Sequence, residues 1–190
     1  AIVNPPAGGQ MSRPKADQPL AENIKSIDVI YPGLMVPKGI KTGRREDGKR
    51  LKILFVGVWF ERKGGRILLT VFRKLSQKYK NISLTILGEL PADITIDVAD
   101  RIRQQNFVSY RKLQYYYQTH HILVHIPPEI EGDCMAVPEA MSYGMCCIVS
   151  DICALPEFIS HKENGLIVKP GSEKSLEEAF ISTCGELKGR

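Results

Sequence analysis

The segment that most constrains the fold of this chain is the apolar run LKILFVGV, residues 51–58. Nearly all of its residues are apolar and several are β-branched, so the run predicts a strand that is buried on both faces. Such strands are typical of parallel sheets, in which helices cover each face. The run therefore favours an α/β fold.

The rest of the chain alternates between strand and helix patterns. RILLTVFRKLSQKY has the apolar spacing of an amphipathic helix, through Ile67, Leu68, Val71, Phe72 and Leu75. Further strands are predicted at ISLTILG, ILVHIP, CCIVSD and GLIVKPGS, and helices at ADRIRQQ, KLQYYYQTH, CMAVPEAMSYG and EKSLEEAFISTC. Either Ser172 or Ser175 can cap the last helix. This alternation predicts a doubly wound parallel sheet, which is a Rossmann-like fold.

The 190 residues suit one domain with a tail. Residues 1–26 are rich in Pro, Gly, Gln and Lys, and we expect them to form a linker or an irregular arm. The short strand predicted at IDVIYPG opens the domain, which we expect to extend over residues 27–190. A chain that begins with Ala is expected to be a fragment or a processed product.

The net charge of +5 suits an anionic nucleoside diphosphate ligand, or contact with an anionic membrane face. Nucleic acid is not an expected partner, because no basic stripe carries interleaved aromatic residues. The five cysteines are an odd number without a C-x-x-C spacing. They predict free thiols in a reducing compartment, the cytoplasm, rather than disulfides or a zinc site.

A glycine-rich turn, GVWFERKGGR, follows the first buried strand. Gly57 ends the strand, and Gly64 and Gly65 precede the helix, so the backbone can approach a ligand closely. The helix start and the cations Arg62 and Lys63 would attract an anion. The turn has neither dinucleotide-binding nor P-loop spacing, so a generic turn with solvated cations fits it equally well.

Glu131 and Glu139 lie in a polar loop and in the short helix after it, with seven residues between them. An ionised carboxylate only accepts hydrogen bonds, so two such groups suit a ligand rich in hydroxyl groups, such as a sugar or a ribose. In an α/β fold, ligands bind beyond the carboxyl ends of the strands, where this loop would lie. The alternative is that both acids are solvated surface residues.

Three segments together resemble the retaining group 1 (family 4-like) glycosyltransferases, which have the GT-B fold. EGDCMAVPEAMSYG is similar to the family pattern E-G-F-G-M-P-x-x-E-A-M-A-x-G. SDICALPEFISHKENGLIVKPGS is similar to S-D-x-G-G-x-P-E-x-I-x-x-x-x-N-G-x-L-V-x-P, and GVWFERKG to G-R-x-x-x-x-K-G. The resemblance extends from about Asp28 to Phe180.

The resemblance implies the C-terminal, donor-binding domain of such an enzyme. Glu131, which orients the donor, and Lys63 would be the catalytic groups. Glu139 would bind the ribose, and Arg62 and Lys63 the diphosphate. The full set of expected substrate-binding residues is Gly57, Arg62, Lys63, Gly64, Glu131, Gly132, Asp133, Cys134, Met135, Val137 and Glu139.

This chain departs from the family pattern at several of these positions. Val58 replaces the arginine that directly follows the first glycine, so Arg62 would supply the missing charge. Asp133 and Cys134 replace the usual Phe and Gly, and Cys134 would narrow the sugar pocket. No D-x-D pair is present, so cations rather than a metal ion would neutralise the leaving diphosphate.

The resemblance implies an enzyme that transfers a sugar from a UDP, GDP or ADP sugar to an acceptor hydroxyl with retention, and that needs no cofactor. An N-terminal acceptor-binding domain would complete it, and this chain alone would have little activity. Two other functions remain open, namely half of a sugar-nucleotide 2-epimerase and a nucleotide-sugar binding module without catalysis. A second Rossmann-like half encoded upstream would favour an enzyme.

The remaining aromatic and histidine residues are expected to be structural. His125 lies in an apolar strand and is expected to pack in the core. His120 and His121 end a helix, where positive charge would suit the helix dipole. Tyr115–Tyr117 are expected to pack one helix face on the sheet.

Overall fold

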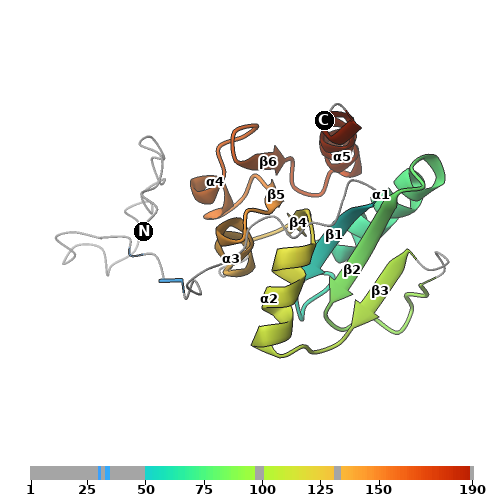
Figure 1. The fold of residues 1–190 in the computed structure, drawn as a ribbon, viewed down its shortest axis with the longest axis horizontal. Helices are drawn as coiled ribbons and strands as arrows, with labels where there is room; N and C mark the ends of the chain where they lie inside the picture. The colour runs from blue at the N-terminus through green and yellow to red at the C-terminus, as the bar shows by residue number, and fades with distance from the viewer. Residues whose placement is uncertain (1–29, 31–32, 35–49, 97–100, 131–133, 189–190) are drawn as a thin grey trace, which may run out of the picture.

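A computed structural model describes residues 30, 33–34, 50–96, 101–130 and 134–188. The expected arm at residues 1–26 lies outside the described residues, as does most of the strand expected at IDVIYPG. The described residues form a parallel sheet with helices on both faces (Figure 1). The predicted fold class, a Rossmann-like α/β fold, is therefore confirmed.

The described part of the chain contains six strands, all parallel, in the order β3-β2-β1-β4-β5-β6. They are β1 (Leu51–Val56), β2 (Ile82–Leu87), β3 (Ile102–Gln105), β4 (Ile122–His125), β5 (Cys146–Ser150) and β6 (Gly165–Val168). This is the strand order of dinucleotide-binding Rossmann folds. The order reverses between β1 and β4, where Ile53 pairs with Ile122. Ligands of such sheets bind beyond the carboxyl ends of the strands at that reversal.

Five helices in the described residues cover the sheet. Helices α1 (Gly65–Lys78) and α5 (Glu173–Lys188) pack on one face, where they also contact each other. Helices α2 (Tyr110–Thr119), α3 (Ala136–Ser142) and α4 (Leu155–Phe158) contribute to the core of the other face. Each face of the sheet therefore has its own buried cluster.

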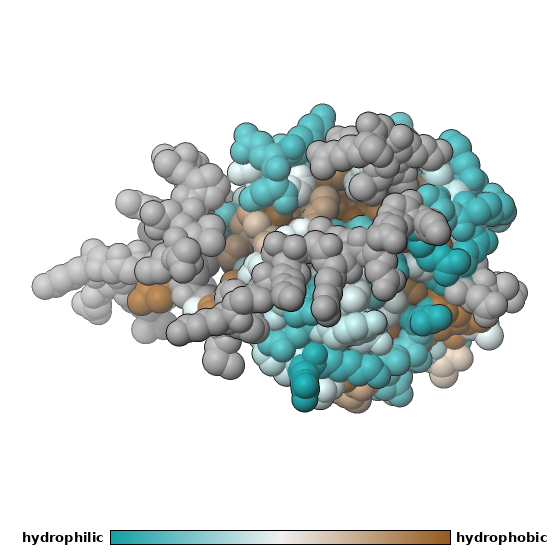
Figure 2. Space-filling view, in the orientation of Figure 1, coloured by the Kyte–Doolittle hydropathy of each residue, from teal (hydrophilic) through white to brown (hydrophobic). Residues whose placement is uncertain are grey.

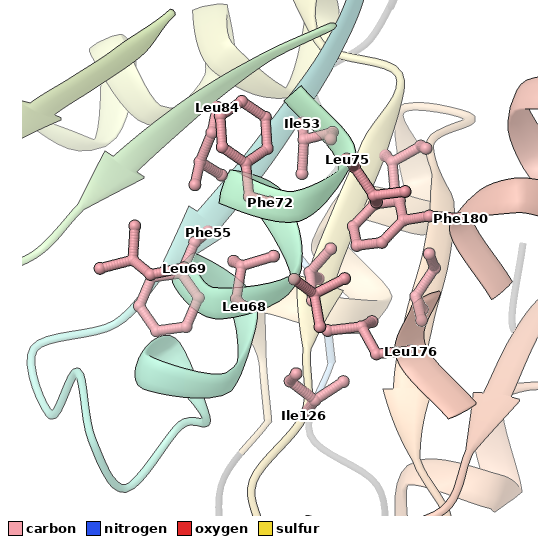
Figure 3. Close-up of a cluster of buried hydrophobic side chains, with 14 of the residues drawn as sticks. Ile53, Phe55, Leu68, Leu69, Phe72, Leu75, Leu84, Ile126, Leu176 and Phe180 are labelled. Atoms are coloured by element: carbon pink, nitrogen blue, oxygen red, sulfur yellow. The ribbon is translucent and has the colours of Figure 1, made fainter. Parts of the chain in front are cut away.

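The apolar stripe predicted for the first helix is buried in α1. Leu68, Val71, Phe72 and Leu75 are buried, and Ile67 is half-buried against the same core. Figure 3 shows side chains of α1 together with Leu176 and Phe180 of α5. Burial of these side chains fixes α1, and with it the position of the turn that precedes the helix.

Hydrogen bonds decide two predictions: which serine caps the last helix, and whether ADRIRQQ forms a helix. Ser172 is the N-cap of α5, since its Oγ accepts from the N–H of Ser175 at 3.2 Å. The helix predicted at ADRIRQQ is wrong, because its last four residues form β3. Arg and Gln favour helices locally. Pairing with β2, including Leu84 with Ile102, outweighs that preference.

Candidate functional site

The turn between β1 and α1 brings a lysine side chain over a glycine backbone. The N–H of Gly57 donates to the carbonyl oxygen of Leu87 at 2.9 Å, so Gly57 continues the sheet. A Cβ added at Gly57 would overlap with Cδ of Lys63. The aliphatic stem of Lys63 therefore crosses directly over Gly57, in space that a side chain would fill.

Gly64 brings the start of α1 against the end of β4. Its φ of 81° is in the left-handed region, and a Cβ there would overlap with the carbonyl oxygen of Ile126. The first turn of α1 contains no acidic residue, and no side chain caps this end of the helix. The N–H groups of Gly64 and Gly65 donate within the turn, to the carbonyl oxygens of Glu61 and Phe60. An anion at the strand reversal would therefore meet later N–H groups of the first turn of α1.

The cations of this turn have different surroundings. Arg66 forms an ion pair with Glu61 and another with Asp93, in which Nη2 lies 2.8 Å from Oδ2. The hydrogen bond to Asp93, and next the one to Glu61, raises the pKa of Arg66. Arg62 is exposed, and Lys63 is half-buried. Acids therefore neutralise Arg66, whereas the stem of Lys63 lies over the backbone of Gly57.

Glu139 lies in the first turn of α3, which follows β4. Its Oε2 accepts a hydrogen bond from the hydroxyl of Tyr117 in α2 at 2.9 Å. Tyr117 is buried, and Glu139 is half-buried. Burial, followed by the charge of Glu139, raises the pKa of Tyr117, so this hydroxyl stays protonated.

Some of the expected site residues lie after two adjacent strands, and others lie outside the described residues. The turn residues Gly57, Arg62, Lys63 and Gly64 follow β1, and α3 follows the adjacent β4. Cys134 and Met135, just before α3, are half-buried, whereas Val137 is fully buried in the core. A contact of the Val137 side chain with a ligand is thus not supported. Glu131, Gly132 and Asp133 lie outside the described residues.

Sequence reasoning missed the hydrogen bond between Tyr117 and Glu139. The expectation that Tyr115–Tyr117 form one packing face holds for Tyr117 and is wrong for Tyr115, which is 60% exposed. A buried tyrosine needs a partner for its hydroxyl group. That requirement, together with an acid on a neighbouring helix, was the signal that could have pointed to the pair.

The histidine predictions have opposite outcomes. His125 is buried, as expected for a core histidine. His120 was expected to be a charged helix-end residue, which is wrong. Its ring is buried, with Nε2 2.9 Å from Oγ1 of Thr85, and burial lowers its pKa to about 4. His120 is therefore neutral at pH 7, and its buried ring has a structural role.

The described residues contain neither a cluster of metal ligands nor a membrane-spanning helix. No group of three His, Cys, Asp or Glu side chains among them is arranged to hold a metal ion. None of the helices in this part of the chain is both long enough and apolar enough to cross a membrane.

The strand order, the glycine turn and the layered helices define a Rossmann-like α/β domain. Residues 39–184 match the model of the "Glycosyl transferases group 1" family, and this chain belongs to that family. The chain is 28% identical over 152 residues to one subunit of the human phosphatidylinositol N-acetylglucosaminyltransferase. It is 30% identical over 126 residues to an "Uncharacterized 41.2 kDa protein in cps region" from Klebsiella pneumoniae.

These alignments cover 76% and 63% of this chain but only 30% and 33% of the relatives. The chain thus spans about a third of the length of the curated relatives it matches.

Solved structures share the fold at low identity. Sucrose-phosphate synthase from Thermosynechococcus elongatus has a TM-score of 0.63 at 20% identity, over 75% of this chain and 38% of that one. HepE from Anabaena, in complex with UDP and glucose, has a TM-score of 0.62 at 19% identity, over 73% of this chain and 39% of that one. The C-terminal domain of a group 1 glycosyl transferase from Francisella tularensis has a TM-score of 0.63 at 21% identity, over 72% of this chain and 77% of that one.

Proposed function

We propose that this chain is the donor-binding domain of a retaining glycosyltransferase of the GT-B, family 4-like type. It would bind a nucleoside diphosphate sugar and present the sugar to an acceptor hydroxyl. The observation that carries the proposal is the edge of the sheet at the β1–β4 reversal, where Lys63 and the start of α1 lie. Family membership and the UDP and glucose bound by the HepE structure support it.

The diphosphate would lie at the turn between β1 and α1. The side chains of Lys63 and Arg62 would bind it, and their charge would stabilise the leaving group as the sugar–oxygen bond breaks. Glu139 would accept hydrogen bonds from the ribose hydroxyls. Glu131 and the backbone from Gly132 to Met135 would orient the sugar.

The acceptor would come from a second, N-terminal domain. The chain corresponds to about a third of its curated relatives, so there is room for such a domain in the whole protein. Large apolar residues are exposed in loops after three strands, namely Val58 and Trp59 after β1, Phe107 after β3 and Ile130 after β4. These loops extend from the carboxyl edge of the parallel sheet, the edge that would face the second domain.

On the face drawn in Figure 2, hydrophilic residues cover much of the described surface, and hydrophobic residues appear in separate small areas. We propose the cytoplasm as the compartment, since the five cysteines are an odd number without a C-x-x-C spacing.

A calorimetric screen against UDP, GDP and ADP, and then their sugars, tests donor binding. Lys63→Ala should weaken binding of the best nucleotide by about tenfold or more, the effect expected for a lost charge-assisted hydrogen bond. The matched control is Lys80→Ala, an exposed lysine just before β2 at the opposite edge of the sheet. Equal affinities in the two variants would overturn the phosphate assignment.

A further inference from the structure

The hydrogen bond between Tyr117 and Glu139 joins two helices that follow different strands. Tyr117 belongs to α2, after β3, and Glu139 belongs to α3, after β4. The tyrosine ring is only 1% exposed, so its hydroxyl reaches Glu139 from within the core. A buried, well-packed hydroxyl holds the Glu139 carboxylate in a more defined orientation than an exposed, flexible side chain would.

The direction of this hydrogen bond is fixed. A carboxylate can only accept hydrogen bonds, so the hydroxyl of Tyr117 must donate. Burial raises the pKa of Tyr117, so the hydroxyl keeps its proton. With one acceptor site of Oε2 engaged by the tyrosine, the carboxylate is held in one orientation, and Oε1 is the oxygen with more capacity to accept from a ligand hydroxyl.

The tyrosine is itself held in place by packing. Its ring lies 5.6 Å from the ring of Tyr143, the residue that caps the C-terminus of α3. Both rings belong to the buried cluster that includes Val137 and Ala140 of α3. Movement of Tyr117 relative to α3 would therefore disturb a packed core, which makes the hydroxyl a rigid support.

We propose that Tyr117 is a positioning residue for donor recognition, which orients the Glu139 carboxylate toward the ribose hydroxyls of the nucleotide. The inference rests on the proposed function, because it assigns a ligand to Glu139. Tyr117 would not touch the nucleotide. It would fix one oxygen of Glu139 so that the other meets the ribose without a loss of rotamer freedom on binding.

The test compares ribose and dideoxyribose nucleotides in Tyr117→Phe. The substitution keeps the buried ring and removes only the hydroxyl. UDP, GDP and ADP are screened by calorimetry on the full chain, and the tightest is compared with its 2′,3′-dideoxy form. We expect Tyr117→Phe to weaken the ribose form by about three- to tenfold, the range for loss of one supporting hydrogen bond. The dideoxy form should change by less than about twofold.

Two further variants separate positioning from general packing. Tyr116→Phe removes the neighbouring hydroxyl, which donates to Oε1 of Gln105 at 3.0 Å, and should leave both affinities unchanged. In a Glu139→Gln background, Tyr117→Phe should weaken the ribose form much less than it does in the wild type, because the two residues act through one contact.

The outcomes distinguish the two proposals. Binding of none of the nucleotides would overturn the proposed function, and the inference with it. Nucleotide binding with equal losses for ribose and dideoxy forms in Tyr117→Phe would overturn the positioning role alone. The positioning role would also be overturned if the losses of ribose-nucleotide affinity caused by Tyr117→Phe and Glu139→Gln simply added in the double variant. A circular dichroism melt of each variant shows whether it is folded at the temperature of the calorimetry.

Discussion

Gly57 illustrates how a residue without a side chain can determine the position of a charge. Gly57→Ala should place a Cβ where the stem of Lys63 now lies, and so displace the ammonium group. We expect about a fivefold or greater loss of nucleoside diphosphate affinity, measured by calorimetry, as for a weakened charge-assisted hydrogen bond. Gly33→Ala is the matched control, because a Cβ there meets no described atom within 4 Å. An affinity loss as large in the control would contradict the role of Gly57.

Glu131 was assigned by resemblance, and its role stays a prediction. Glu131→Ala should leave nucleoside diphosphate binding nearly unchanged and reduce the extra affinity contributed by an attached hexose. The reason is that a group that orients the sugar has no contact with the nucleotide. Calorimetry with the diphosphate and with its sugar measures both affinities. Equal losses for the two ligands would instead indicate a disturbed loop.

His120 should make the folded state sensitive to acid. Its pKa is lowered from 6.5 to about 4 in the folded protein. Between these values the unfolded chain binds a proton that the folded chain does not, so stability falls as the pH falls from about 6.5 to about 4. Glutamine cannot titrate. Over this pH range, the free energy of unfolding of His120→Gln, measured in urea, should therefore fall by about 1–3 kcal/mol less than that of the wild type. An unchanged pH dependence in the variant would show that His120 is not the group responsible.

At the scale of elements, the cluster between α1 and the sheet should account for much of the stability. Phe72 is fully buried in that cluster. Phe72→Ala should lower the free energy of unfolding by about 3–5 kcal/mol, from lost burial and a residual cavity. Phe107→Ala, at a residue that is 77% exposed, should change it by less than about 0.5 kcal/mol. Similar midpoints of chemical unfolding for the two variants would contradict this assignment of the core.

The sequence predicted long elements better than short ones, for a physical reason. The segments that became β1 and α1 carry their own burial pattern, so local residues were sufficient to predict them. The residues of β3 have only Ile102 to bury, and the open edge of β2 decides their structure. The place of Lys63 in a glycine turn after β1 could be predicted from the sequence, and its role in binding stays a prediction. The hydrogen bond of Tyr117 joins residues 22 positions apart and depends on how two helices pack.

At the scale of the whole molecule, the proposed function assigns only the donor side of the reaction to this chain. The isolated 190-residue chain should bind a donor but show no more than trace sugar transfer. The acceptor groups would come from another domain, and catalysis needs both reactants held together. Radiolabelled sugar transfer, with and without a supplied N-terminal half, measures this. Efficient transfer by the chain alone would contradict the half-enzyme proposal.

Under the proposed function, the ion pairs of Arg66 would affect the release of the product. Because Glu61 and Asp93 neutralise that cation, Arg66 adds little to the positive charge at the turn. A nucleoside diphosphate carries an additional negative charge once its sugar has been removed. A further available cation would hold this spent nucleotide more tightly than the intact donor. Under the proposed function, the two acids would therefore limit retention of the product. Their replacement by neutral residues should make the nucleoside diphosphate a stronger inhibitor of the complete enzyme.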